Sequence, residues 1–248
     1  MSAIAIIPAR YGSTRFPGKP LIHIGDKTMI RRVYENTRSV KALDDVIVAT
    51  DDERIKKEVL SFGGKAVMTS LHHQSGTERC AEAVSGLDPK PDIVINVQGD
   101  VPFVASDHIQ KILNCFQDSN TQIATVIKLI TDAGKLISPH IVKVVFNRKM
   151  QAIYFSRTPI PYVRDVNSEI WHSTFNFYEH IGLYGYSSEV LAAIAKLPQG
   201  TLERAESLEQ LRWLENGYTI RLAETTFENI SIDTPEDLSQ VMVKLTHG

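Results

Sequence analysis

The sequence contains little cysteine and no long apolar run. Cys80 and Cys115 are its only cysteines, and neither lies in a CxxC or Cys/His spacing, which favours buried side chains of a reduced protein over a disulfide framework or a zinc site. No stretch approaches the roughly 18 uninterrupted apolar residues that a membrane-spanning helix needs. The apolar stretch near the start is short, lacks a basic leader and runs into Pro8, which is typical of a strand rather than a signal peptide. We therefore expect a soluble, cytoplasmic protein with no membrane partner.

An excess of basic charge is also missing. The chain of 248 residues carries 27 Lys and Arg against 29 Asp and Glu, a formal net charge of −2. A general nucleic-acid binder normally carries a basic excess, so we expect no nucleic-acid partner and assign any phosphate binding to a local cluster of cations. The composition, 43% hydrophobic and 23% charged, is that of an ordinary globular protein with enough apolar residues for a sizeable core.

Short apolar runs alternate with helical periods in the first half of the chain. The runs predict strands at 4–7, 46–50, 65–68 and 92–97, and the periods between them predict helices at 28–40, 51–62 and 77–86. Strands separated by helices in this way predict parallel βαβ units with right-handed crossovers. The runs do not alternate with polar residues, which is typical of strands covered on both faces.

The pattern changes from about residue 122. Apolar runs at 122–129, 141–146, 151–156 and 181–186 predict an antiparallel block, with a hairpin turn at 147–150 and a polar loop around 164–169. Two helices are expected at 187–197 and 202–217, followed by a strand at 218–224 and a strand, turn and helix at 231–245. In the second helix, Glu206 and Glu209 are three residues apart and are expected on one face. With no repeat or linker, we predict one α/β domain, 1–248, with an insertion at about 122–187.

The loop at 8–21, PARYGSTRFPGKPL, directly follows the first strand and carries three cations, Arg10, Arg15 and Lys19. In open parallel sheets ligands bind beyond the carboxyl ends of the strands. Cations and inward-pointing backbone amides in one concavity suit a polyphosphate. The loop is not a Walker A motif, because five residues rather than four separate its glycines and proline follows its lysine; it also lacks GxGxxG. The alternative is a basic surface loop rich in turn residues.

Two isolated carboxylates also follow predicted strands. Asp100 ends NVQGD and Asp233 lies in SIDTP, so both side chains are expected to face one cleft. A hard cation such as Mg²⁺ accepts one or two carboxylates and fills its other positions with phosphate oxygens and water. The pair therefore predicts a metal–nucleotide site opposite the cationic loop. The alternatives are that Asp100 is a turn residue and that Asp233 caps the following helix.

The adjacent histidines His72 and His73 are a weaker signal. A pair of imidazoles can indicate a metal site, but neighbouring residues on an extended chain point to opposite sides. We therefore interpret His72 and His73 as loop residues that do not share a ligand.

Eight segments resemble one known family. They are IPARYGSTRFPGKPL, VATDD, SGTER, NVQGD, YFSRTPIPY, HIGLYGY, AESLEQLRWLENG and IDTPEDL. They occur in the order found in the 3-deoxy-manno-octulosonate cytidylyltransferases, or CMP-Kdo synthetases, and the similarity runs almost to the C-terminus. The first motif is shared more loosely with other sugar nucleotidyltransferases, including CMP-sialic acid synthetases, whereas YFSR and ESLEQLR are much more specific.

This resemblance implies the reaction CTP + Kdo → CMP-Kdo + pyrophosphate, where Kdo is 3-deoxy-manno-octulosonate, for lipopolysaccharide biosynthesis. It implies a three-layer nucleotide-diphospho-sugar transferase fold with a mainly parallel sheet, and a homodimer built through the antiparallel insertion. Two alternatives stay open: a CMP-sugar synthetase for another 2-keto sugar acid, such as a Kdo analogue or sialic acid, and a non-catalytic nucleotide-sugar sensor.

The resemblance also assigns roles to individual residues. Catalysis is assigned to Arg10, Lys19 and Asp100, and Mg²⁺ binding to Asp100 and Asp233. Nucleotide binding is assigned to Arg10, Ser13, Arg15, Lys19, Gln74 and Ser75. Sugar binding is assigned to Gln98, Arg157, His180, Tyr184, Glu209 and Gln210, with Arg157 as the natural partner of the Kdo carboxylate. The sequence departs from the family pattern at Val101, where the family usually has Glu. If this chain differs from the family, we expect the difference in its substrate preference and metal affinity.

Overall fold

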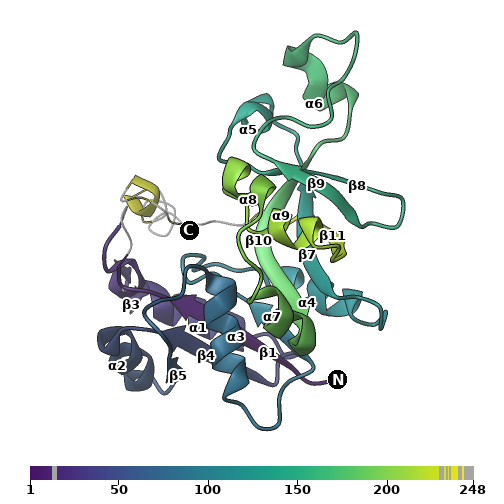
Figure 1. Cartoon of the computed structure of the whole chain (residues 1–248). Coiled ribbons are helices and arrows are strands. Elements are labelled where there is room, and N and C mark those ends of the chain that lie inside the picture. The colour runs from purple at the N-terminus through teal and green to yellow at the C-terminus, as the bar shows by residue number, and fades with distance from the viewer. Residues whose placement is uncertain (13–15, 229–231, 233, 235, 240–241, 243–248) are drawn as a thin grey trace. The chain divides into compact units, whose positions relative to one another are not determined.

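The computed structural model describes residues 1–12, 16–228, 232, 234, 236–239 and 242. The backbone divides into two compact units, Met1–Gln110 with Asn229–Gly248, and Lys111–Glu228. Figure 1 colours the chain along its length, so that residues 1–110 run from purple to teal and residues 111–228 from teal to yellow-green. The single-domain interpretation of 1–248 stays a prediction.

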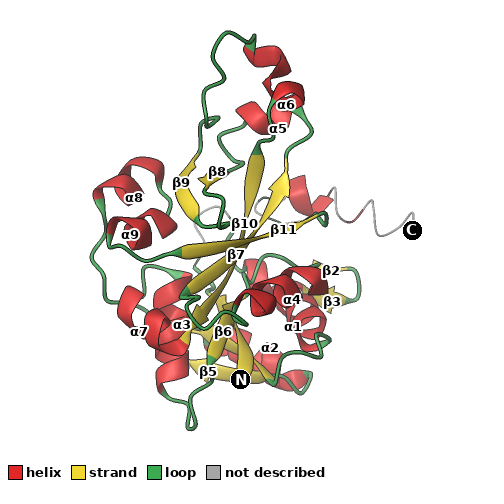
Figure 2. Ribbon diagram, turned by 90° about the vertical axis from the view of Figure 1, so that its right-hand side faces the viewer, coloured by secondary structure: helices red, strands yellow, loops and turns green. Residues whose placement is uncertain are grey.

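Four parallel strands form the sheet of the first unit, in the order β6-β1-β4-β5. Their bounds are Ala3–Ala9 (β1), Asp45–Thr50 (β4), Lys65–Met68 (β5) and Ile93–Asn96 (β6). The connecting helices are Met29–Arg38 (α1), Glu53–Ser61 (α2) and Gly76–Ser85 (α3). Figure 2 shows α1 and α2 on one side of these strands and α3 on the other. The predicted parallel βαβ units are therefore confirmed.

Burial and capping explain these elements. Ala5, Ile6 and Ile7 on the central strand β1 are fully buried, as expected for a strand covered on both faces. Each helix begins at a side chain that caps it: Thr28 accepts from a first-turn amide of α1, and Asp52 does the same for α2. A fourth helix, α4 (Ser106–Cys115), contains the boundary between the two units at Gln110 and was not predicted.

The sheet of the second unit is mainly antiparallel. β10 (Tyr178–Ser187) pairs antiparallel with β7 (Ile123–Leu129) and with β8 (Lys143–Phe146). β8 in turn forms the predicted hairpin with β9 (Ala152–Ser156). The last strand, β11 (Ile220–Thr225), pairs parallel with β7. The prediction of an antiparallel block from residue 122 is confirmed for β7 to β10.

A small apolar cluster lies at one end of this unit. Ile130, Leu136, Trp171 and Phe177 are its buried members. Three short elements surround it, α5 (Ala133–Ile137), η2 (Ser168–Ile170) and α6 (Trp171–Thr174). The loop expected around 164–169 therefore leads directly into the short helices, which are too short to show a helical period in the sequence.

The prediction of one helix over 202–217 is wrong. After α7 (Ser188–Ile194) the chain forms two helices, α8 (Thr201–Glu206) and α9 (Gln210–Glu215). Ser207 between them has φ 52°, a left-handed conformation that ends α8. Glu206 and Glu209 therefore do not share a helical face. The break lets Glu203 on α8 form a buried ion pair with Arg212 on α9. On one continuous helix, residues nine apart would face opposite sides.

The strand, turn and helix predicted at 231–245 fall mostly outside the described residues. Within the part of the chain that the structure describes, no helix is both long and apolar enough to cross a membrane.

Candidate functional site

A pocket of about 240 Å³ lies in the first unit, beyond the carboxyl ends of β1 and β6. Its wall comes from four segments, 8–10, 19–20, 73–79 and 98–100. Six of the residues to which the resemblance assigns a role line it, namely Arg10, Lys19, Gln74, Ser75, Gln98 and Asp100. The structure thus gathers residues that lie up to 90 positions apart in the sequence at the sheet edge where an open α/β fold binds its ligands.

Two glycines allow these segments to come together. Gly99 passes so close to β1 that a Cβ atom there would lie 2.9 Å from the carbonyl oxygen of Pro8. Gly18 has φ 72°, which favours glycine, and its amide donates to the carbonyl of Tyr11 at 3.0 Å. This bond closes the cationic loop, so that the following 3-10 turn η1 (Lys19–Leu21) presents Lys19 to the pocket.

Lys19 and Asp100 form an ion pair inside the pocket. The ammonium donates to Asp100 Oδ2 at 2.8 Å, and the two side chains are 12% and 31% exposed. Asp100 thus keeps contact with solvent while its charge is offset by a cation. The amide of Ile232 donates to the Asp100 carbonyl at 3.0 Å, so Ile232 lies beside the backbone of Asp100.

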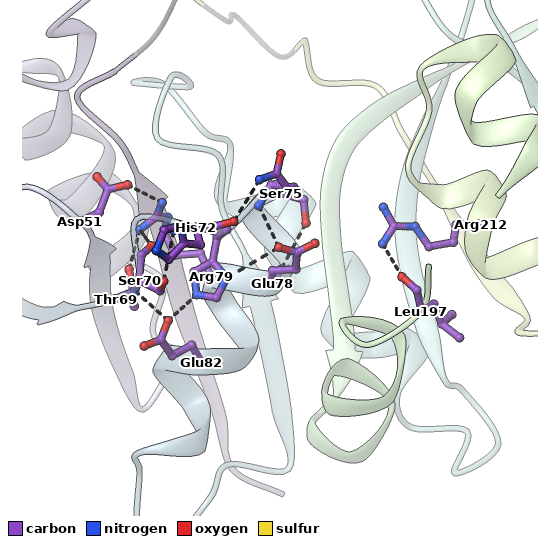
Figure 3. Close-up of polar contacts among 12 residues, drawn as sticks. Asp51, Thr69, Ser70, His72, Ser75, Glu78, Arg79, Glu82, Leu197 and Arg212 are labelled. Carbon is purple, nitrogen blue, oxygen red and sulfur yellow. Dashed lines mark hydrogen bonds and ion pairs between the residues drawn. The ribbon is translucent and has the colours of Figure 1, made fainter. Parts of the chain in front are cut away.

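Arg79 on α3 is a pocket residue that the sequence reasoning missed. It is 4% exposed, pairs with Asp51 after β4 at 2.7 Å, and donates to the Thr69 hydroxyl at 2.5 Å and to the Ser70 carbonyl at 3.4 Å (Figure 3). Through these contacts Arg79 attaches α3 to Thr69 and Ser70, which precede the pocket residues of segment 73–79. The only signal in the sequence is the arginine at the end of SGTER, where position alone does not distinguish it from a solvated helix residue.

Val101, which stands where the family pattern has Glu, is 5% exposed and packs as a core residue. It is not among the described residues that line the pocket. Its amide donates to the Gln98 carbonyl at 3.3 Å, so its backbone helps to form the turn that carries Asp100. The departure from the family pattern therefore affects the packing of the turn that carries Asp100, and not the described residues that line the pocket.

The remaining residues assigned to sugar binding belong to the second unit. Arg157, after β9, donates its side-chain N–H groups to the carbonyls of Glu206, Pro139 and Ser207 at 2.7, 3.0 and 3.3 Å. Its backbone amide donates to the Glu206 carboxylate at 3.0 Å. Lys143, whose side chain is fully buried, donates to the Arg157 carbonyl at 2.5 Å. These bonds fix the position of Arg157, and neutral carbonyls accept from its guanidinium.

His180 and Tyr184 lie together on β10, with their ring centroids 5.2 Å apart. Burial lowers the pKa of His180 to about 3, so the imidazole is neutral at physiological pH, and its Nε2 lies 3.1 Å from the Thr125 hydroxyl. Burial, and then the nearby Tyr186 and Glu209, hold the pKa of Tyr184 well above its usual range. Among the described residues, the buried Tyr184 hydroxyl has no hydrogen-bond partner.

Glu209 and Gln210 stand at the start of α9. Glu209 is partly exposed and Gln210 is 5% exposed. The ring of Trp213, one turn further along α9, meets the Tyr184 ring edge-on at 5.0 Å. The second unit therefore brings Tyr184, His180 and the first turn of α9 together, and Arg157 is held by the segment just before it.

Three assigned residues, Ser13, Arg15 and Asp233, lie outside the described residues. Within the described ranges no group of three or more His, Cys, Asp or Glu side chains is placed to hold a metal ion. The roles assigned to the site residues and the magnesium site stay predictions.

The family model described as cytidylyltransferase matches residues 4–228. Three curated relatives bear the name 3-deoxy-manno-octulosonate cytidylyltransferase. The protein from Parabacteroides distasonis is 51% identical over 100% of this chain and 99% of its own length. Those from Phocaeicola vulgatus and Thermodesulfovibrio yellowstonii are 52% and 47% identical, over 97% and 96% of this chain and 96% of their own lengths.

Two solved structures are also similar to this chain. CMP:2-keto-3-deoxy-manno-octonic acid synthetase, solved in complex with CTP, matches with a TM-score of 0.92 and 40% identity over 100% of this chain and 99% of its own. A 4-diphosphocytidyl-2C-methyl-D-erythritol synthase from Anaerococcus prevotii matches at 17% identity with a TM-score of 0.65, covering 99% of this chain and 98% of its own, and supports the fold alone. The expected α/β nucleotide-diphospho-sugar transferase fold is confirmed. The chain belongs to the cytidylyltransferase family, in its 3-deoxy-manno-octulosonate cytidylyltransferase group, and is a nucleotidyltransferase.

Proposed function

We propose that this chain transfers the cytidylyl group of CTP to Kdo, releasing pyrophosphate and supplying CMP-Kdo for lipopolysaccharide assembly. The observation that carries the proposal is the convergence of Arg10, Lys19 and Asp100 on one pocket at the carboxyl end of β1. The solved relative in complex with CTP and the full-length similarity to Kdo cytidylyltransferases support the nucleotide and the sugar.

In the proposed reaction, the anomeric hydroxyl oxygen of Kdo attacks the α-phosphorus of CTP. The bond from that phosphorus to pyrophosphate breaks, and the hydroxyl proton is released. Such transfers depend mainly on positioning and on charge stabilisation. Arg10 and Lys19 would stabilise the charge that develops on the departing pyrophosphate.

Magnesium is part of the proposal. The donors fit a hard cation, because Asp100 offers a partly exposed carboxylate in a pocket whose cations attract phosphate oxygens. Asp100, together with Asp233, would hold Mg²⁺, which supplies charge neutralisation at the α-phosphate and lowers the pKa of the attacking hydroxyl. Lys19 offsets the charge of Asp100.

We assign binding of the sugar acid to residues of the second unit. Because neutral carbonyls accept the hydrogen bonds of Arg157, its positive charge stays available for the carboxylate of a 2-keto sugar acid. The neutral His180 and the Tyr184 hydroxyl suit the hydroxyl groups of such a sugar.

Pyrophosphate release tests this function. The purified chain with CTP and Mg²⁺ is offered Kdo, an 8-amino Kdo analogue and sialic acid in separate reactions. We expect turnover with Kdo to exceed turnover with the other two acceptors. Faster turnover with another acid would show that this acid, and not Kdo, is the preferred substrate. CTP binding without pyrophosphate release from any acceptor, at high protein concentration, would favour the non-catalytic sensor.

We also propose a homodimer formed through the 122–187 insertion. Several large apolar side chains of the insertion are exposed, and association would remove them from water. They are Ile137, Ile153, Tyr162, Ile170 and Phe175. Tyr162 is 75% exposed and meets Trp171 edge-on at 5.1 Å, so it extends the small apolar cluster to the surface.

Light scattering after gel filtration tests the dimer. We expect twice the chain mass for the wild type and the chain mass for Tyr162→Glu, because a buried carboxylate opposes association. Leu60→Glu, at a 53% exposed site on α2, is the matched control and should leave the mass unchanged. A monomeric wild type, or a dimer that survives Tyr162→Glu, would contradict this interface.

A further inference from the structure

The two adjacent histidines lie in different environments, and the proposed reaction uses neither. His72 is exposed, and its imidazole forms no hydrogen bond or ion pair with the described residues. The side chain of His73 is 18% exposed and lies between two carboxylates of α3. Its Nε2 contacts Glu82 Oε2, and its Nδ1 is 3.6 Å from Glu78 Oε2.

The same two glutamates hold the backbone around His73. Glu82 Oε2 accepts the amide of Ser70 at 2.9 Å, and Glu78 Oε2 accepts the amide of Gln74 at 2.8 Å. The Glu78 amide in turn donates to the Ser75 hydroxyl at 3.2 Å, which caps α3. Figure 3 shows Glu78 and Glu82 in succession along α3, with Ser70 and Ser75 beside them. Both ends of the segment 70–75 are therefore attached to one helix.

His73 joins the two attachment points. Glu78 and Glu82 are four residues apart, where two like charges on a helix repel each other. A neutral imidazole donates from one ring nitrogen only, which serves the Nε2 contact with Glu82; a ring that carries hydrogen on both nitrogens donates towards both carboxylates and reduces that repulsion. The Ser70 amide lowers the pKa of Glu82, and His73 adds to this effect, so the carboxylate that anchors the segment stays ionised.

The anchored segment forms part of the pocket wall, since Gln74 and Ser75 line the pocket. We propose that His73 is a positioning residue for nucleotide binding: it bridges Glu78 and Glu82 and thereby fixes 70–75 in the conformation that receives CTP. This inference rests on the proposed function, because it takes the nucleotide to be CTP.

His73 also lines the pocket itself, so positioning must be separated from direct contact. Glu82 separates them, because it is not among the described residues that line this pocket. A positioning role predicts that Glu82→Ala weakens binding as His73→Ala does. A direct contact with CTP predicts an effect of His73→Ala alone.

The experiment measures CTP affinity by calorimetry in the presence of Mg²⁺, together with hydrogen exchange of the Ser70 and Gln74 amides. His73→Ala and Glu82→Ala should each raise the Kd about tenfold. The double variant should weaken binding by less than the product of the two single effects, because both changes break the contact between His73 and Glu82. His73→Gln, whose amide can replace Nε2 towards Glu82, should recover most of the affinity. His72→Ala is the matched control and should bind as the wild type does.

In both alanine variants the Ser70 and Gln74 amides should exchange faster, while amides of β1 keep their protection. Wild-type affinity in Glu82→Ala with weak binding in His73→Ala would overturn positioning in favour of direct contact. Wild-type affinity and exchange in His73→Ala would overturn any role. If His73→Ala does not fold, Glu82→Ala and His73→Gln decide by the same criteria. A wild type that binds no CTP rejects the proposed function, and exchange at Ser70 and Gln74 then decides whether His73 fixes this segment.

Discussion

The buried ion pair between Glu203 on α8 and Arg212 on α9 predicts a large loss of stability when the arginine is removed. The side chains are 8% and 4% exposed, and two guanidinium nitrogens donate to the carboxylate at 2.7 and 2.6 Å. Arg212 also donates to the Leu197 carbonyl at 2.9 Å (Figure 3). Arg212→Met leaves the Glu203 charge buried without its partner, which costs about 3–5 kcal/mol. This is a large fraction of the roughly 5–15 kcal/mol that stabilises a typical domain.

Urea denaturation followed by tryptophan fluorescence measures this loss, since Trp213 is the neighbour of Arg212 and is almost fully buried. The midpoint should fall while the slope with urea stays unchanged. Arg204→Met is the matched control: Arg204 is an exposed arginine of α8 with one long bond to a carbonyl, and its removal should change stability by less than about 0.5 kcal/mol.

A second variant tests the cause of the loss. The double variant Glu203→Leu with Arg212→Met removes both charges, so it should be more stable than Arg212→Met alone. A loss below about 1 kcal/mol for Arg212→Met, or a double variant less stable than the single one, would refute the assignment of the loss to an unpaired buried charge.

Three further predictions concern other parts of the chain. Asp100→Asn should lower kcat about a hundredfold while urea unfolding stays as in the wild type, because it removes the carboxylate proposed to hold Mg²⁺. Activity within a few-fold of wild type would remove Asp100 from the metal site. The pKa of His180 is lowered to about 3 in the folded chain. Below about pH 6.5 the unfolded chain therefore binds a proton at His180 and the folded chain does not, so stability decreases as the pH is lowered. Between pH 7 and pH 5 this loss should be about 2 kcal/mol larger in the wild type than in His180→Gln by urea unfolding, and equal losses would show that His180 takes up a proton when folded. Gly99→Ala should destabilise the chain by about 1–3 kcal/mol, because its Cβ would lie 2.9 Å from the Pro8 carbonyl. Gly86→Ala, whose Cβ would have its nearest neighbour at 3.9 Å, should not, and equal thermal melts of the two would contradict the close approach.

The parallel sheet could be predicted because its strands carry the information locally. Residues 4–7 and 93–95 are continuous apolar runs, and a strand covered on both faces requires such a run. The cationic loop and Asp100 could be placed near each other for a related reason, since parallel strands end at one edge of the sheet. The short helices α5 and α6 could not be predicted, because they make too few turns for a period to appear.

The break at Ser207 and the role of His73 required the structure. Most residues at 202–217 favour a helix, and the ion pair between Glu203 and Arg212, which needs the turn at Ser207, cannot be seen in the sequence. Sequence reasoning correctly interpreted His72 and His73 as loop residues. It could not identify the two carboxylates that His73 meets, because that contact depends on how the loop folds back onto α3.

The Glu203–Arg212 pair also determines how far α9 can rotate about its own axis. A helix turns by about 100° per residue, so a shift of one residue would carry Gln210 from a buried position to a different side of the helix. With Arg212 held by Glu203, the rotation of α9 does not depend on the length of the link at 207–209. Natural or engineered insertions in that link should therefore preserve the direction of Gln210, whereas an insertion between Gln210 and Arg212 should not.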